Sequence, residues 1–139
     1  MNVVFENPKR DVNVELIART CDFFGVPFFI THSQKIEAKK SGGVLKGCTP
    51  KILDILSWRG RIIVTDSSFT ERPEDIDWQE DDLLVLGNEA HGVSKKVLDK
   101  AVHRIGIKSV GKVPCLNVGH ACSAILALAH AELCGKELK

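Results

Sequence analysis

Short apolar runs alternate along this chain with stretches of helical periodicity, and this alternation is the feature that most limits the possible folds. Strands that alternate with helices assemble into a mostly parallel sheet, because each helix must carry the chain back across the sheet. The sequence therefore predicts an α/β fold with an open, mostly parallel sheet and helices on both faces. Strands are expected at residues 3–5, 27–31, 61–65, 83–86 and 102–107.

Helix signals lie between these runs. Apolar side chains recur at spacings of three and four from Asn13 to Phe24, with Asp11 or Asn13 as a capping residue and Gly25 as a left-handed stop. Thr49-Pro50 predicts the start of a helix that ends near Arg59. A short helix after Ser94 and a long apolar helix at 117–133 complete the pattern. Residues 33–48, and the acidic stretch 71–82 with Trp78, are expected as surface loops.

Length and composition predict one intracellular domain. The 139 residues are the size of an ordinary single domain, and no apolar run was expected to be long enough to span a membrane. The beginning of the chain lacks the features of a secretory signal. Five scattered cysteines without a C-x-x-C pair argue against disulfides and against a metal site, and most are expected to be buried. A net charge of +1 does not predict tight nonspecific binding to nucleic acid, although a local basic patch remains possible.

Common catalytic and nucleotide-binding motifs are missing. There is no G-x-G-x-x-G after the first strand, no P-loop and no G-x-S-x-G elbow. Ligands of open parallel sheets bind beyond the carboxyl ends of the strands, so the stretches that follow the strands are the places to look.

Three local stretches stand out, and each also has an ordinary structural interpretation. Residues 13–20 place Asn13 and Arg19 on one amphipathic helix, under two turns apart. Residues 83–94 run from a buried strand into a turn with Glu89 between Gly87 and Gly92. Residues 113–124 open a helix of small residues with Asn117. Taken singly, these patterns fit a capped helix, a turn between a strand and a helix, and a tightly packed helix.

In order, the three stretches resemble the three motifs of the SPOUT RNA methyltransferases of the TrmH/SpoU type. The motif N-x-G-x-I-x-R-T is matched by residues 13–20, a strand followed by G-x-E-x-x-G by 83–92, and S-L-N-V-S by 115–119. The resemblance covers essentially the whole chain. It implies that residues 1–139 are a single catalytic domain with a deep C-terminal trefoil knot, active as a homodimer. The scattered cysteines fit a reducing cytoplasmic setting.

The resemblance also implies a reaction and its residues. S-adenosylmethionine would donate a methyl group to a ribose 2′-hydroxyl of RNA, with tRNA favoured over rRNA because no RNA-binding domain is appended. The catalytic residues would be Arg19, Asn13, Glu89 and Asn117. The cofactor would be held by Leu86, Gly87, Glu89, Gly92, Ile105, Gly106, Ile107, Leu116 and Asn117. RNA is expected to contact Arg10, Lys39, Lys40 and Arg59, and no metal is expected.

Three positions depart from the family pattern. Glu15 replaces the glycine of the first motif, and Cys115 and Gly119 replace the two serines of the third. Three alternatives therefore stay open: a SPOUT enzyme that methylates a base, a catalytically silent module that binds S-adenosylmethionine or RNA, and an unrelated flavodoxin-like domain. A guanidinium has a pKa above about 12, so Arg19 is expected to orient or stabilise the acceptor rather than to take its proton.

Overall fold

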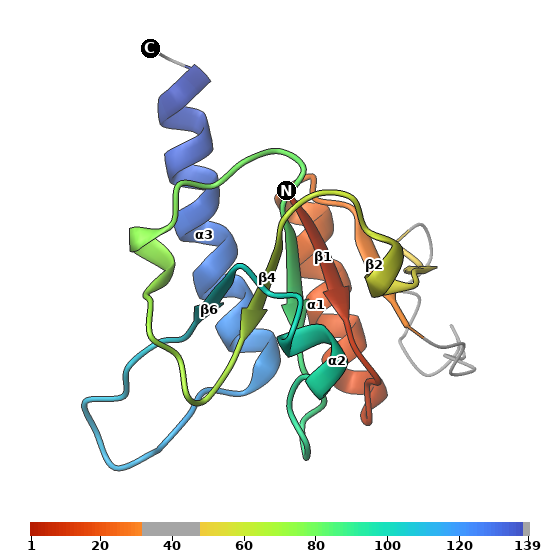
Figure 1. The fold of residues 1–139 in the computed structure, drawn as a ribbon, viewed down its shortest axis with the longest axis vertical. Coiled ribbons are helices and arrows are strands. Elements are labelled where there is room, and N and C mark those ends of the chain that lie inside the picture. The colour runs from red at the N-terminus through yellow and green to blue at the C-terminus, as the bar shows by residue number, and fades with distance from the viewer. Residues whose placement is uncertain (32–47, 138–139) are drawn as a thin grey trace.

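The structure is a computed structural model that describes residues 1–31 and 48–137. Within these residues, six strands form one sheet in the order β3-β2-β1-β5-β4-β6, and every neighbouring pair is parallel (Figure 1). The expected parallel α/β architecture is thus confirmed. The chain order reverses between β1 and β5, the arrangement in which parallel sheets place ligands. The strands are β1 (Asn2–Phe5), β2 (Phe28–Ile30), β3 (Lys51–Ile52), β4 (Ile62–Thr65), β5 (Leu83–Leu86) and β6 (His103–Ile105).

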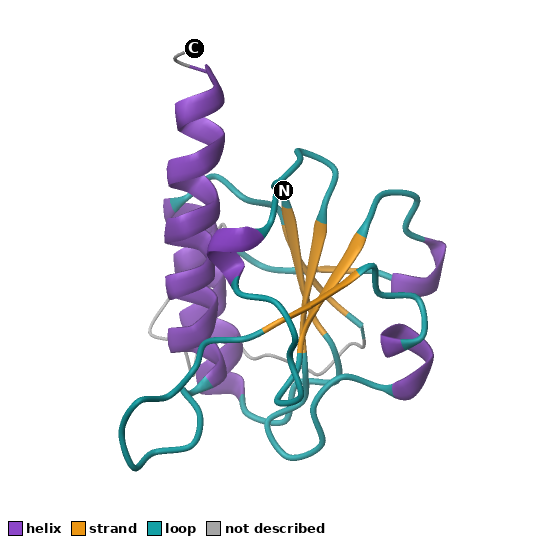
Figure 2. Ribbon diagram, turned by 60° about the vertical axis from the view of Figure 1, so that its left-hand side comes forward, coloured by secondary structure: helices purple, strands orange, loops and turns teal. Residues whose placement is uncertain are grey.

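The two faces of the sheet are covered differently. Alternate residues such as Phe5 and Leu86 pack under α1 (Asp11–Phe23) and α3 (Val118–Glu137). Their neighbours, such as Val4 and Val85, pack under η1 (Ile55–Ser57) and α2 (Lys95–Leu98). Figure 2 shows the two long helices on one side of the strands and short helical turns on the other. All four residues of β5 are buried, which explains why this strand is apolar throughout.

The ends of the two long helices agree only partly with the sequence. Arg10 occupies the N-cap of α1 without a side-chain hydrogen bond, so the prediction that Asp11 or Asn13 caps this helix was wrong. Gly25 has a φ of 66° and ends the helix as predicted. Asn117 caps α3, because its Oδ1 accepts hydrogen bonds from the backbone N–H groups of Gly119 and His120.

The predicted helix at 49–59 is not formed. Residues 51–52 instead pair with β2 as an edge strand, and Asp54 caps the 3-10 turn η1 through a hydrogen bond from the Leu56 N–H. This pairing is a contact with a distant segment, which the local start signal Thr49-Pro50 could not indicate. The short helix after Ser94 is shorter than expected, and Ser94 makes no capping hydrogen bond from its side chain.

The acidic stretch before β5 is partly buried, unlike the predicted surface loop. Trp78 is 1% exposed and its indole N–H donates to the Pro73 carbonyl at the start of η2 (Pro73–Asp75). Asp82 is fully buried and accepts two hydrogen bonds from the Arg61 guanidinium, at 2.8 and 2.7 Å. A paired, hydrogen-bonded carboxylate of this kind can be buried where an isolated one could not.

Strand β6 is held on both of its edges. On one side it pairs with β4, and the Asp66 N–H donates to the Ile105 carbonyl at 3.1 Å. On the other side Glu71 bridges to Ile105, and the Gly106 N–H donates to the Glu71 carbonyl at 3.2 Å. The link 66–71 therefore passes around the chain where it leaves β6.

Helix α3 is the last element and the longest. Residues 118–135 are long and apolar enough to cross a membrane by length and composition, which corrects the expectation that no segment would be, and 28% of this window is buried. In the structure α3 lies along α1, with Cys122, Ile125 and Ala129 in the core. One helix of this length and composition is weak evidence for a membrane span.

Candidate functional site

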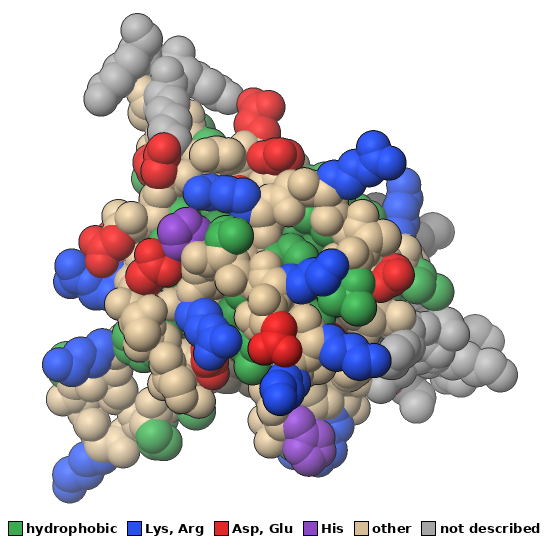
Figure 3. Space-filling view, viewed as in Figure 1, with side chains coloured by type: hydrophobic (Ala, Val, Ile, Leu, Met, Phe, Trp, Pro, Cys, Tyr) green, Lys and Arg blue, Asp and Glu red, His purple; other side chains and the backbone are tan. Residues whose placement is uncertain are grey.

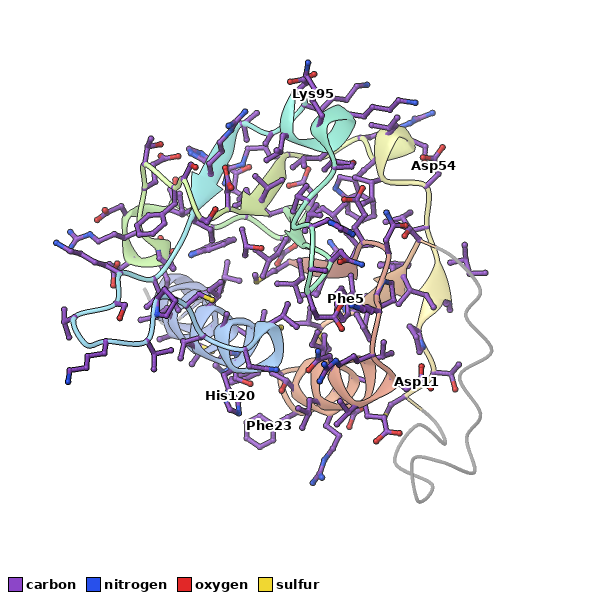
Figure 4. All side chains as sticks on the ribbon, turned by 90° about the horizontal axis from the view of Figure 1, so that it is seen from below. Phe5, Asp11, Phe23, Asp54, Lys95 and His120 are labelled. Carbon is purple, nitrogen blue, oxygen red and sulfur yellow. The ribbon has the colours of Figure 1, made fainter. Side chains whose placement is uncertain are left out.

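A cavity of about 530 Å³ opens at the carboxyl end of the sheet, beside the point where the strand order reverses. Figure 4 looks onto this end, with Asp11 and His120 at the starts of α1 and α3 on one side and Lys95 on the other. Five segments line the cavity, namely residues 9–13, 65–69, 86–92, 105–107 and 114–125. The volume lies within the range of small-molecule and cofactor sites.

Three polar side chains form a continuous hydrogen-bonded chain along one wall of the cavity. The Asn117 amide donates to the Asn13 Oδ1 at 3.0 Å, and the Asn13 amide donates to the Glu89 Oε2 at 3.0 Å. Asn13 is 3% exposed, so both bonds are shielded from water. The chain links α3, α1 and the loop after β5, which are far apart in the sequence.

Glu89 is held as a carboxylate. Burial alone would raise its pKa, but hydrogen bonds outweigh that effect and leave the pKa of Glu89 below its ordinary value of 4.5. The donors include the Lys9 N–H at 3.0 Å, the Asn13 amide and the Arg10 N–H at 2.8 Å. A negative charge is therefore fixed at the edge of the cavity.

The loop that carries Glu89 is folded tightly back on itself. The Asn88 and Gly92 backbones exchange hydrogen bonds of 3.1 and 2.8 Å, and Gly92 has a φ of 69°. A Cβ on Gly87 would lie 2.4 Å from the Gly92 carbonyl carbon, which no relaxed structure allows. Gly87 is thus required by the close approach of two backbone segments, and Gly92 by its left-handed conformation.

The structure brings together most of the side chains that the sequence singled out. Asn13, Glu89 and Asn117 line the cavity, as does Arg10. The residues proposed from the resemblance to hold a cofactor, Leu86, Gly87, Glu89, Gly92, Ile105, Gly106, Ile107, Leu116 and Asn117, all lie on its wall.

Four of the expected basic residues lie away from the cavity or outside the described residues. Arg19 is exposed on α1 and does not line the cavity of its own chain. Arg59 precedes β4 and is therefore at the amino end of the sheet, opposite the cavity. Lys39 and Lys40 lie outside the described residues.

Sequence reasoning missed one wall of the cavity. Thr65 ends β4, Asp66 and Phe69 follow it, and all three line the site together with the loop after β6. The Phe69 ring packs against Gly106, where a Cβ would come within 2.1 Å of it. The position of these residues at the carboxyl end of an apolar strand was the available signal, because the same rule identified the cavity residues that follow β5 and β6.

The three departures from the family pattern have different surroundings. Cys115 is exposed and lines the cavity. Gly119 is buried, and a Cβ there would lie 3.1 Å from the Asn117 Oδ1 and 3.3 Å from Leu16, so this helix start fits glycine closely. Glu15 is half-buried on α1 and does not line the cavity. Cys21 and Cys122 are buried but the other three thiols are not, so the expectation that most cysteines are buried was wrong.

Comparison with known proteins agrees with this geometry. The sequence pattern of the SpoU rRNA Methylase family matches residues 1–127. The chain is 30% identical to the tRNA (guanosine(18)-2'-O)-methyltransferase of Aquifex aeolicus, over 89% of this chain and 66% of that protein. It thus spans just under two thirds of the length of this relative.

Solved structures share the fold. The crystal structure of the A. aeolicus TrmH/SpoU tRNA modifying enzyme is 29% identical, with a TM-score of 0.84 over 98% of this chain and 76% of that one. The SpoU methyltransferase AviRb from Streptomyces viridochromogenes, solved in complex with the cofactor AdoMet, is 21% identical, with a TM-score of 0.81 over 97% of this chain and 61% of that one.

Proposed function

Because this chain belongs to the SpoU rRNA Methylase family, we propose that residues 1–139 form one catalytic domain that methylates RNA. In this proposal a methyl group passes from S-adenosylmethionine to a ribose 2′-hydroxyl. The hydrogen-bonded chain of Asn117, Asn13 and Glu89 at the cavity is the observation that carries the proposal. It unites one residue from each of the three motifs that suggested the family.

The cavity has the size and chemistry for S-adenosylmethionine. When bound, the cofactor supplies an electrophilic methyl group on a positively charged sulfonium. The carboxylates of Glu89 and Asp66 line the cavity and offer it negative charge. Apolar side chains such as Ile105 and Phe69 offer a surface for an uncharged ring, as cofactor sites usually do.

We place Arg19 at the acceptor in a homodimer. Arg19 does not line the cavity of its own chain, so a second copy would have to present it. Apolar side chains suited to an interface are exposed on both long helices, including Val12, Phe23 and Leu128 at 54%, 82% and 40%. The passage of residues 66–71 around the chain at Gly106 supports a trefoil knot as the frame of this site.

Arg19 would then bind and orient the acceptor strand. A guanidinium grips a phosphate through two parallel hydrogen bonds, which a lysine cannot copy. We therefore expect Arg19→Lys to lower single-turnover methylation by at least a hundredfold with the affinity for S-adenosylmethionine unchanged. Near-normal single-turnover rates would contradict the role of the guanidinium.

The charges of the chain support RNA as the substrate. Although the net charge is only +1, acidic residues gather at 77–82 beside the amino ends of β1 and β4, and basic residues gather at the carboxyl end. In Figure 3 most Lys and Arg side chains of this face lie in its lower half. Lys9 and Arg10 line the cavity, and Lys95, Lys96, Lys108 and Lys112 lie within a few residues along the chain of segments that line it. All six are exposed, and none of the ion pairs found among the described residues involves them.

We propose that this basic rim holds RNA phosphates. Replacing Lys95 and Lys96 together by glutamate should weaken RNA binding and flatten its dependence on salt, because fewer counterions are released. Lys51, an exposed lysine on the edge strand β3, provides the matched control. A salt dependence equal to that of the wild type would remove α2 from the RNA surface.

One experiment tests the whole proposal. Total RNA is incubated with the protein and labelled S-adenosylmethionine, and the modified nucleotide is mapped by nuclease digestion and mass spectrometry. A 2′-O-methylated nucleotide in tRNA is expected, in keeping with the tRNA substrate in the name of the Aquifex relative. A methylated base would favour the base-methylating alternative, and cofactor binding without product would favour a silent module. We also propose a cytoplasmic location, without membrane attachment.

A further inference from the structure

We infer that Glu6, which lies outside the three motifs, is a positioning residue that sets the shape of the cofactor loop. The inference rests on the proposed function, because the loop matters only if the cavity binds S-adenosylmethionine. Glu6 directly follows β1 and its side chain is 6% exposed. It does not line the cavity, so it would act through the loop rather than by touching the cofactor.

Glu6 holds both ends of this loop. Its backbone N–H donates to the carbonyl of Leu86, the last residue before the loop, at 2.8 Å. Its carboxylate accepts hydrogen bonds from the Ser94 N–H at 2.6 Å and from the Ser94 hydroxyl at 2.7 Å, where the loop ends. The residue that directly follows β1 thereby links the entry and the exit of residues 87–93.

The two ends of the loop must be held in place because its backbone segments at Gly87 and Gly92 lie very close together. A Cβ on Gly87 would lie 2.4 Å from the Gly92 carbonyl carbon, so no side chain fits at residue 87. Glu89 and Asn88 tie the middle of the loop to the same neighbouring segment, through the Lys9 and Arg10 N–H groups and the Asn7 carbonyl. Glu6 bonds to Ser94, where the loop ends and α2 begins. Without these bonds, Ser94 and the start of α2 would be free to move away from Gly87 and Gly92.

Burying the Glu6 carboxylate costs desolvation free energy, which a purely structural link between two neutral groups would not. Desolvating a charged group is unfavourable unless hydrogen bonds compensate, and here two donors from one residue do so. Short hydrogen bonds to a carboxylate are about twice as strong as those between neutral groups, and they fix geometry closely. The position of this pair, at the switch between β1 and β5, is where such a constraint bears on a ligand.

The test separates positioning from stability. Glu6→Met keeps the side-chain volume and removes both acceptors, whereas Glu6→Gln can still accept from the Ser94 N–H and donate to its hydroxyl. We expect Glu6→Met to raise the dissociation constant for S-adenosylmethionine at least tenfold, and Glu6→Gln to raise it less than threefold. The constants are measured by isothermal titration at a temperature where each variant is folded.

Ser94→Ala supplies an independent route if Glu6→Met does not fold. It loses one of the two bonds, so a threefold to fivefold weaker cofactor affinity is expected, with no further loss when combined with Glu6→Met. Glu74→Met, at an exposed carboxylate in η2, is the matched control and should leave the affinity unchanged.

Two results would overturn the inference. One is a lowered melting temperature in Glu6→Met with wild-type affinity for the cofactor, which would make Glu6 a stabilising residue only. The other is wild-type affinity in Ser94→Ala. Failure of the wild-type protein itself to bind S-adenosylmethionine would instead refute the proposed function, and the inference with it.

Discussion

Replacing Asn13 by aspartate should reverse the way in which the stability of this protein depends on pH. The change is nearly isosteric, but it puts a carboxylate oxygen where the Asn13 amide now donates to Glu89 at 3.0 Å. Two unit charges at that distance repel by about 5 kcal/mol at an effective dielectric constant of 20. One of the two carboxyl groups would therefore stay protonated, and the pair would share that proton, so that the two negative charges do not exist side by side.

Protonation sets the size of the effect. Keeping a carboxyl group of ordinary pKa 4.5 protonated near pH 7 costs about 1.4 kcal/mol for each pH unit, or about 3 kcal/mol. We expect Asn13→Asp to lower the free energy of unfolding by about 2 to 3 kcal/mol near pH 7, and by less than about 1 kcal/mol near pH 5. Urea denaturation followed by circular dichroism at the two pH values measures both differences.

The sign is opposite in the wild-type protein. The pKa of Glu89 is below 4.5 in the folded state, so its stabilising effect is present above that pH and is lost as the pH falls through the folded pKa. In Asn13→Asp the raised pKa makes stability fall as the pH rises from about 4.5 to about 7. Asn117→Asp is the control, since it would face the neutral Asn13 amide oxygen and cost about 1 kcal/mol. A loss that is the same at both pH values would refute the reasoning.

Two further predictions concern the cavity. Gly87→Ala should lower the free energy of unfolding by about 2 to 3 kcal/mol and remove most of the cofactor affinity, because its Cβ would meet backbone atoms at 2.4 Å. Gly92→Ala has open space for its Cβ and should lower the free energy of unfolding by about 1 to 2 kcal/mol, because its φ is positive. Titration with S-adenosylmethionine and urea denaturation check both, and equal effects of the two changes would contradict the clash. Cys115 is exposed in the cavity wall, so iodoacetamide should label it first, and saturating S-adenosylmethionine should slow this at least fivefold. Cys21 should stay unlabelled, because a hydrogen bond with Cys122 and burial raise its pKa. Mass spectrometry of the peptides measures the labelling of each thiol. If S-adenosylmethionine does not protect Cys115, the cofactor binds elsewhere.

Local patterns predicted the parts of the fold that local interactions determine. The apolar runs gave the strands, Gly25 ended α1, and Asn117 capped α3. The polar residues after β5 pointed to the cavity because the carboxyl ends of parallel strands meet at one edge. The three motifs are far apart in the sequence and meet at this edge through direct hydrogen bonds.

Distant contacts explain the failures. Residues 51–52 became a strand because the edge of β2 was free to pair, which overrode the helix signal of Thr49-Pro50. Trp78 is buried although acidic residues surround it in the sequence, because it joins the core with residues of α1 and α3, and its backbone N–H donates to Glu132, 54 residues away. From the sequence alone, Glu6 looks like an ordinary charged residue at the end of a strand. Its partner Ser94 is 88 residues away, so no local pattern could indicate their hydrogen bond.

Helix α3 has a consequence for the newly made chain. The apolar face of α1 and one side of the sheet are covered by α3, which is the last element. Until α3 has been made and has packed, the strands and α1 present an uncovered apolar surface. Such a surface is prone to aggregation, so chaperones that shield apolar surfaces should raise the yield of folded protein until α3 is in place.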